Sequence, residues 1–280
     1  MNSLKTTFLL GLMTVLFVFV GFFIGGQTGM LFALIFAGTM NFFMYWFSDK
    51  LILKRYKATE ISQKEAPELH RAVGNLAEMA GIPCPKVYLI PDQTPNAFAT
   101  GRNPRHAAVA VTRGLLATLD QKEMEAVIAH ELSHILNRDT LIGVIAATFA
   151  GAISYLAIVA RWSMLLGGGR RRRGGNIFVM LAVSILAPLA AAIVQMAISR
   201  GREFKADRSA AKLTGRPQAL ASALQKLETH NKRQKKHPVQ QQTATAHMFI
   251  VNPLSRKGMS KLFSTHPPVR DRVKRLKDIR

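Results

Sequence analysis

AVIAHELSHILNRD, residues 126–139, contains the pattern H-E-x-x-H, formed by His130, Glu131 and His134. Two histidines four residues apart leave the same face of a helix about one turn apart, so both imidazoles can bind one Zn²⁺. A glutamate that directly follows the first ligand can reach a water on that metal without binding the metal itself. The segment therefore predicts a zinc-binding helix with His130 and His134 as ligands and Glu131 as the general base.

The residues that flank this pattern bear on a simpler interpretation, an amphipathic helix that carries two surface histidines. The flanking side chains are apolar on every side: Val127, Ile128, Ala129, Leu132, Ile135 and Leu136. A helix with apolar residues all round is largely buried. Buried helices rarely contain histidine and glutamate unless these side chains are paired or bind a metal. The flanks therefore favour the zinc site.

The charge of the chain is strongly positive and unevenly distributed. The net charge is +22 over 280 residues, and residues 199–280 carry 20 Lys and Arg against 5 Asp and Glu. Such an excess is typical of proteins that bind nucleic acid or an anionic membrane surface. Long uncharged apolar blocks favour the membrane, and no RNA-binding aromatic signature accompanies the basic residues. The single cysteine, Cys84, excludes an internal disulfide and fits a reducing compartment.

Two apolar blocks at the N-terminus predict a transmembrane hairpin. Residues 6–24 and 30–47 are uncharged, and residues 25–29 form a short polar turn between them. A signal peptide is the alternative, but the first block is long and the second follows at once. Basic residues lie at both outer ends of the hairpin and none lies at its turn. The positive-inside rule therefore places both ends in the cytoplasm.

Two further apolar blocks, residues 140–160 and 176–199, are long enough to cross a membrane. The loop between them contains the arginine run 170–173, which a full crossing would place outside the cell, against the positive-inside rule. Either the N-terminal hairpin dominates the topology or these blocks cross incompletely. We favour four spans, because stretches of this length are hard to bury otherwise. An even number of crossings keeps the zinc helix and the C-terminal part on one side.

The segment between the two apolar pairs predicts a small α+β unit. Asp120, with Glu123 three residues later, is a capping-box signal that marks the start of the zinc helix. Periodicity and turn residues predict the other elements, which are a helix at 65–80, a strand at 86–90, paired strands at 96–101 and 106–112, and a short helix from residue 115. Further helices are expected at 217–229 and 269–279.

A catalytic zinc site usually has three protein ligands and an open fourth position. Glu203 is the best candidate for the third ligand, and Asp207 lies one turn later, where it can accept a hydrogen bond from a ligand histidine. The alternative is a pair of acids on a basic helix that form salt bridges with neighbours such as Arg202 or Lys205. Spacing alone leaves both interpretations open.

Four motifs together resemble the HtpX family of membrane zinc metalloproteases, which is similar in turn to the CAAX prenyl proteases. They are HELSHILNRD at 130–139, SRGREFKAD at 199–207, PNAFATG at 95–101 and THPP at 265–268. The resemblance covers nearly the whole chain, and the four motifs occur in the family's order. Apart from the zinc motif, each is modest by itself.

This resemblance implies roles for particular residues. It implies that His130, His134 and Glu203 hold one Zn²⁺ per subunit, that Glu131 is the base, and that Asp207 supports a ligand histidine. Asn96, Ala97 and Phe98 would lie on an edge strand that binds an extended substrate peptide. His266 would either stabilise the oxyanion or have a structural role at a helix N-terminus. The arginine run 170–173 has no counterpart in the family's catalytic pattern.

We therefore expect an integral membrane α-helical bundle of about four transmembrane helices joined to a mostly α-helical, α+β zincin-type metalloprotease domain with a small sheet. The expected regions are an N-terminal transmembrane hairpin at 1–50, a cytoplasmic metalloprotease domain at 51–139, a second transmembrane pair with a basic loop at 140–199, and a C-terminal cytoplasmic part at 200–280 that completes the zinc site.

The expected function is a zinc endopeptidase of the bacterial inner membrane. Its active site would face the cytoplasm and cut misfolded or damaged membrane proteins, as part of quality control and the stress response. Membrane lipids and unfolded membrane proteins are the expected partners, and nucleic acid is not. Alternatives are a processing protease of the prenyl-protease type and a zinc-stabilised membrane adaptor without catalysis. No motif indicates a particular oligomeric state.

Overall fold

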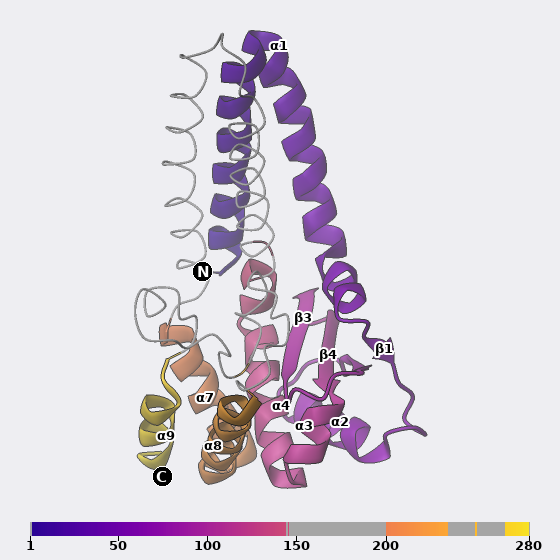
Figure 1. Cartoon of the computed structure of the whole chain (residues 1–280), viewed down its shortest axis with the longest axis vertical. Helices are drawn as coiled ribbons and strands as arrows, with labels where there is room; N and C mark the ends of the chain where they lie inside the picture. The colour runs from indigo at the N-terminus through magenta and orange to yellow at the C-terminus, as the bar shows by residue number, and fades with distance from the viewer. Residues whose placement is uncertain (1, 144, 146–199, 235–249, 251–266, 280) are drawn as a thin grey trace.

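The computed structural model describes residues 2–143, 145, 200–234, 250 and 267–279. In it, a long apolar hairpin stands on a mixed domain of helices and strands (Figure 1). The apolar blocks predicted at 140–160 and 176–199 lie outside the described residues except for the first few positions, and so does the arginine run 170–173.

The hairpin is α1 (Asn2–Arg55), which bends sharply at Gly25 and Gly26. The predicted turn at residues 25–29 is therefore confirmed, although two residues suffice to make it. Asn41 joins the two arms, because its Nδ2 donates to Thr14 Oγ1 at 2.9 Å across the hairpin. The arms approach so closely near the bend that a Cβ on Gly29 would lie 2.2 Å from the carbonyl oxygen of Gly21.

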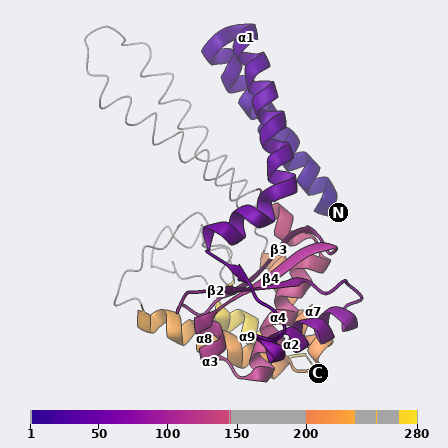
Figure 2. The ribbon, with the colours of Figure 1, turned by 90° about the vertical axis from the view of Figure 1, so that its right-hand side faces the viewer.

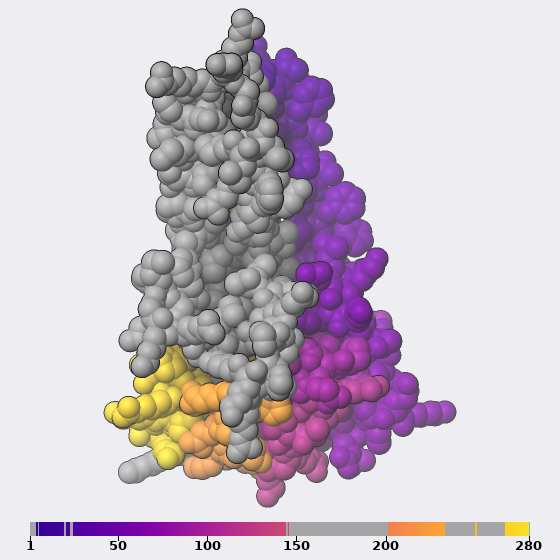
Figure 3. Space-filling model, in the orientation of Figure 1, coloured from indigo at the N-terminus to yellow at the C-terminus, as the bar shows by residue number. Residues whose placement is uncertain are grey.

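The outer surface of α1 is apolar. Large hydrophobic side chains are exposed along it, such as Phe32 at 69% exposure and Ile35 at 60%. The hairpin rises above the domain in Figure 3. Within the described residues, Gly25–Arg55 is the helix long and apolar enough to cross a membrane, and Thr6–Phe19 is a shorter apolar helix. A helix of 31 residues exceeds the about 20 that a bilayer core needs. A full crossing by the first arm, and hence the bundle of four helices, stays a prediction.

The sheet contains four strands in the order β1-β2-β4-β3. Strand β2 (Lys86–Ile90) is parallel to β4 (His106–Thr112), while β1 (Thr59–Glu60) and β3 (Ala97–Asn103) are antiparallel to their neighbours. The predicted bounds of β2 and β4 are confirmed, and β3 runs two residues beyond its prediction. The two-residue strand β1 was not predicted. Strand β3 is therefore the end strand of the described sheet, and on its outer edge the Ala99 nitrogen donates to Glu131 and the Gly101 carbonyl accepts from Thr140.

Alternating residues of the strands bury opposite faces of this sheet. In Figure 2 the sheet lies between the hairpin and the helices beneath it. Ala99 and Val109 face a core built with α2 (Pro67–Met79) and α4 (Gln121–Leu136). Phe98 and Ala110 face the last turns of α1, around Leu53. One face of the sheet thus packs on the hairpin and the other on α2 and α4, which fits the period of two in β structure. The segment after α4 also packs directly on the hairpin, where Leu141 and Ile142 share a cluster with Leu9 and Met13.

Helix α4 starts with the predicted capping box. The Asp120 side chain accepts from the Glu123 backbone at 2.9 Å, and Glu123 accepts in return from Asp120 at 3.0 Å. The other helices in the described part of the chain are α3 (Arg113–Thr118), α7 (Arg200–Thr214), α8 (Pro217–Gln234) and α9 (Val269–Lys277). Side chains from α7, α8 and α9 share one buried core with α4, so the C-terminal helices lie against the histidine helix.

Candidate metal centre

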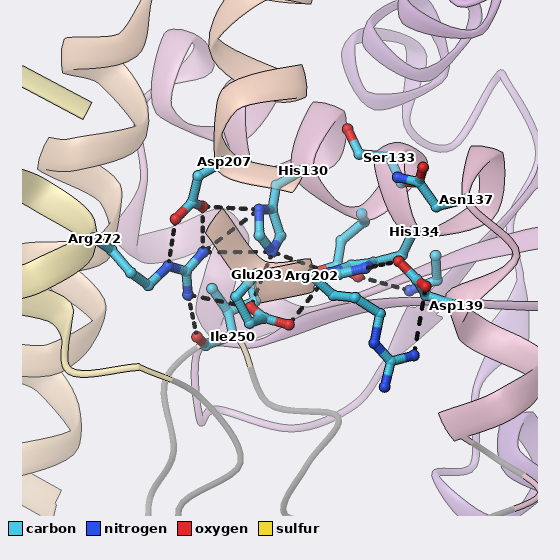
Figure 4. A network of polar contacts seen from close by, with 12 residues as sticks. His130, Ser133, His134, Asn137, Asp139, Arg202, Glu203, Asp207, Ile250 and Arg272 are labelled. Carbon is cyan, nitrogen blue, oxygen red and sulfur yellow. Dashed lines mark hydrogen bonds and ion pairs between the residues drawn. The ribbon is translucent and has the colours of Figure 1, made fainter. Parts of the chain in front are cut away.

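Three side chains from α4 and α7 converge on one point (Figure 4). His130 Nε2 lies 3.2 Å from His134 Nε2, and each of these nitrogens lies 3.6 Å from a carboxylate oxygen of Glu203. His130 and Glu203 are buried, and His134 is half-buried. The structure therefore brings together two residues of one helix and a third that is 69 positions further along the chain than His134 (203 − 134).

The spacing of these atoms can be compared with the geometry of zinc. Ligand atoms at about 2.0–2.1 Å from a tetrahedral Zn²⁺ are about 3.3 Å from one another. The 3.2 Å between the two histidine nitrogens is close to that spacing, and each nitrogen lies 3.6 Å from a different oxygen of Glu203. One ligand atom from each of the three residues lies within 4.8 Å of the others. Two imidazole nitrogens and one carboxylate are also the donor set of many catalytic zinc sites. These residues fit a bound zinc ion, with a fourth position left for other ligands.

Each histidine is held by a second carboxylate at its other ring nitrogen. His130 Nδ1 lies 3.0 Å from Asp207 Oδ1, and His134 Nδ1 lies 3.3 Å from Asp139 Oδ2. Such contacts fix the tautomer and orientation of a metal-binding histidine, so that Nε2 is free for the metal. The sequence predicted this position for Asp207 but gave Asp139 no role.

The alternative interpretation of Glu203 and Asp207 as acids in surface salt bridges does not describe these contacts. Both carboxylates are buried, Glu203 at 6% exposure and Asp207 at 3%. The neighbouring bases have other partners, because Arg202 Nη1 lies 3.4 Å from Asp139 and Lys205 Nζ donates to Asn137.

Arg272 on α9 completes the buried charge network, and the sequence analysis missed it. Its side chain is 0% exposed, and its Nε and Nη2 donate to the two oxygens of Asp207 at 2.9 and 2.6 Å. The signal was present, because residue 272 shares the helical spacing of the buried Val269 and Leu276. The sequence analysis predicted a helix at 269–279 but gave none of its residues a role in the site.

Glu131 lies between the histidines and the edge strand. Its side chain is buried, and its Oε2 accepts a hydrogen bond from the backbone nitrogen of Ala99 on β3 at 3.0 Å. That nitrogen lies on the edge of β3 that faces away from β4 in the described sheet. The carboxylate predicted to act as base is therefore fixed next to the strand predicted to bind substrate.

The three residues predicted to bind substrate lie at the start of this strand but point in different directions. Asn96 is buried just before β3, and its Oδ1 accepts from the Ile250 backbone nitrogen at 3.2 Å. Ala97 faces the α4 side, whereas the Phe98 ring packs on the opposite face against Tyr56, with 5.3 Å between ring centroids. His266 lies outside the described residues.

The buried charges shift the pKa values of two groups in the metal-free protein. Burial lowers the pKa of the His130 imidazole, but hydrogen bonds to Asp207 and Glu203 outweigh it and raise that pKa from 6.5 to about 9. Burial raises the pKa of the Asp207 carboxyl, but the Arg272 charge and hydrogen bonds from His130 and Arg272 lower it to about 2. A metal that binds at neutral pH must therefore displace a proton from His130.

Zinc affinity should depend on pH for this reason. Binding releases the His130 proton, so the apparent affinity should rise about tenfold per pH unit from pH 7 toward 9 and then level off. Competition with a chromophoric chelator at several pH values measures this slope. Asp207→Asn is the matched variant. It removes a group that raises the His130 pKa, so the pH above which zinc affinity no longer rises should be lower. A flat profile in the unmodified protein would show that His130 is already neutral.

The chain is similar to known proteins over most of its length. Residues 63–280 match the profile of "Peptidase family M48". A "Protease HtpX homolog" from Syntrophotalea carbinolica is 53% identical over 281 residues, covering 100% of this chain and 99% of the relative. Another from Pyrococcus furiosus is 53% identical over 277 residues, with 98% and 95% covered.

A solved structure shares the fold. The crystal structure of Ste24p from S. mikatae aligns with a TM-score of 0.55 at 19% identity. The alignment covers 98% of this chain and 64% of that protein. At this identity the likeness concerns the fold alone.

Proposed function

Because this chain belongs to peptidase family M48, it is a metallopeptidase, and we propose that it is a zinc endopeptidase that cuts misfolded or damaged membrane proteins at their cytoplasmic face. The observation that carries the proposal is the convergence of His130, His134 and Glu203, whose ligand atoms all lie within 4.8 Å of one another. The buried Glu131 lies on the same helix. The apolar hairpin supports the membrane as the place of action.

The three converging residues would hold the metal, with His130 and His134 binding through Nε2 and Glu203 through its carboxylate. A bound zinc ion would make a water nucleophilic near neutral pH and polarise the substrate carbonyl. A purely structural zinc site is closed by four protein ligands, whereas the described residues contribute a group of three here. The open set favours catalysis over the adaptor alternative.

Glu131 would move the proton during hydrolysis. Its carboxylate can accept a proton as water attacks the peptide carbonyl, and it can then donate that proton to the leaving amine. The hydrogen bond from Ala99 limits the freedom of the carboxylate, so that it stays close to the histidines. Preorganisation of this kind reduces the entropy lost in reaching the transition state.

Substrate would bind as an added strand on β3. Backbone groups on this edge, apart from those already bonded to Glu131 and Thr140, can pair with an extended peptide whatever its side chains, which suits an enzyme with many substrates. The far end of β3 lies against the hairpin, where the Arg102 guanidinium stacks over Trp46 at 4.5 Å. Ala99 is three residues from Arg102, so at about 3.3 Å per residue the site would lie roughly 10 Å from the base of the hairpin. Segments that leave the membrane would reach the site directly.

The proposal can be tested in proteoliposomes that contain the purified protein and a single-span substrate. The substrate carries either an unfolded cytoplasmic segment or the same segment stabilised by a tight ligand. We expect cleavage of the unfolded form alone, at bonds close to the membrane boundary located by mass spectrometry. Equal cleavage of both forms would contradict the role in quality control. Cleavage restricted to a lipidated peptide would favour the processing protease instead.

A further inference from the structure

The two histidines at the metal centre are supported by parallel chains of contacts. His130 contacts Asp207, which binds Arg272, and His134 contacts Asp139, which pairs with Arg202. The two chains differ in strength. Arg202 Nη1 lies 3.4 Å from Asp139 Oδ1, whereas Arg272 donates to both oxygens of Asp207 at 2.6 and 2.9 Å.

The Arg272 guanidinium is held from every side. Its Nη1 donates to the Ile250 carbonyl at 3.0 Å and lies 3.7 Å from Glu203 Oε2. Its Nη2 lies 3.5 Å from His130 Nδ1 and 3.4 Å from His130 Nε2. These nearly equal distances place the guanidinium beside the imidazole ring rather than in line with either nitrogen. Burying the charge of an arginine costs free energy unless well-placed partners replace its hydration, and these contacts supply such partners.

The planar fork of arginine explains the choice of residue. Two parallel N–H groups fix both oxygens of Asp207, so the carboxylate cannot rotate, and its Oδ1 keeps pointing at His130 Nδ1. The imidazole is then fixed with Nε2 toward the other two ligands. A lysine would supply the charge but not the fixed plane.

We propose that Arg272 is a positioning residue of the metal centre, which acts through Asp207 on His130 and makes the docking of α9 a condition for tight metal binding. Removing outer contacts of a metal ligand typically weakens metal binding about 10–100-fold. The inference rests on the proposed function only in taking zinc as the metal. It assigns to the C-terminal helix a part in the site that the ligand residues alone do not reveal.

The test measures zinc binding rather than catalysis, on full-length protein in detergent that carries Glu131→Gln to prevent self-cleavage. Chelator competition gives the dissociation constant, and the visible absorption of bound Co²⁺ reports the geometry of the ligands. Arg272→Met should weaken zinc binding about 10–100-fold and alter the Co²⁺ spectrum. Arg272→Lys should restore only part of the affinity. The matched control is Arg275→Met, because Arg275 lies one turn away over the Phe204 ring and should leave binding within about threefold.

A double-mutant cycle separates positioning from a general loss of folding. If Arg272 acts through Asp207, then Arg272→Met should change zinc affinity little in a protein that already carries Asp207→Asn. Additive losses in that cycle would overturn the proposal, and so would an unchanged affinity in Arg272→Met alone.

Bound zinc should also slow tryptic cleavage within α9 of the protein with an unmodified Arg272. An equal cleavage rate with zinc and with chelator would contradict the coupling between metal binding and the docking of α9. Tight zinc binding by a protein that cleaves nothing would refute the proposed function but leave this inference intact.

Discussion

Replacing Glu131 with glutamine is expected to reduce peptide hydrolysis by about 10²–10⁴-fold while zinc binding changes little. Glutamine keeps the size of the side chain and its acceptor for the Ala99 backbone nitrogen, but it cannot take a proton. The base is not one of the three converging ligands, so the metal should stay bound. Hydrolysis of casein and zinc content, measured on the same preparation, test both parts of this prediction.

Glu125→Gln provides the matched control, because Glu125 is on the same helix and pairs with Arg216 on the surface, away from the histidines. It should retain the activity of the unmodified protein. If the Glu131 variant hydrolysed casein at a comparable rate, another group would have to be the base.

Replacing Glu203 with glutamine is expected to weaken zinc binding by more than about 100-fold. Outer contacts of a zinc ligand already contribute about 10–100-fold, and a direct carboxylate ligand should contribute more. The change also removes a buried negative charge next to His130 and Arg272, so less charge is available to neutralise the metal. Chelator competition measures the affinity, and activity should return only at high zinc concentration.

Glu228→Gln is the control for charge alone, because this exposed glutamate on α8 pairs with Lys232 far from the site. It should bind zinc as tightly as the unmodified protein. A Glu203 variant with unchanged affinity would remove Glu203 from the ligand set and direct attention to residues outside the described part of the chain.

Local signals predicted much of this fold. The capping box of Asp120 and Glu123 predicted the start of α4. A short run of small apolar residues after a polar turn predicted the bounds of β4. Both signals act over a few residues, so the sequence contains them completely. The spacing of His130 and His134 likewise depends on a single helix.

Contacts between distant segments could not be read in the same way. Asp139 and Arg272 contribute to the site only because α4, α7 and α9 share one core, and that packing depends on the whole domain. A run of basic residues at 270–277 hid one buried arginine among exposed ones. Ile250 joins Asn96 to Arg272 through its backbone, which no side-chain pattern reveals.

The most direct test of this account is a zinc titration of chelator-treated protein in detergent, with bound zinc and casein hydrolysis followed together. We predict that hydrolysis returns in proportion to bound zinc and saturates near about one zinc per chain. The Glu131→Gln protein should bind the same amount and remain inactive. Full hydrolysis in the zinc-free protein, or saturation of the site without any hydrolysis by the unmodified protein, would contradict a zinc peptidase centred on His130, His134 and Glu203.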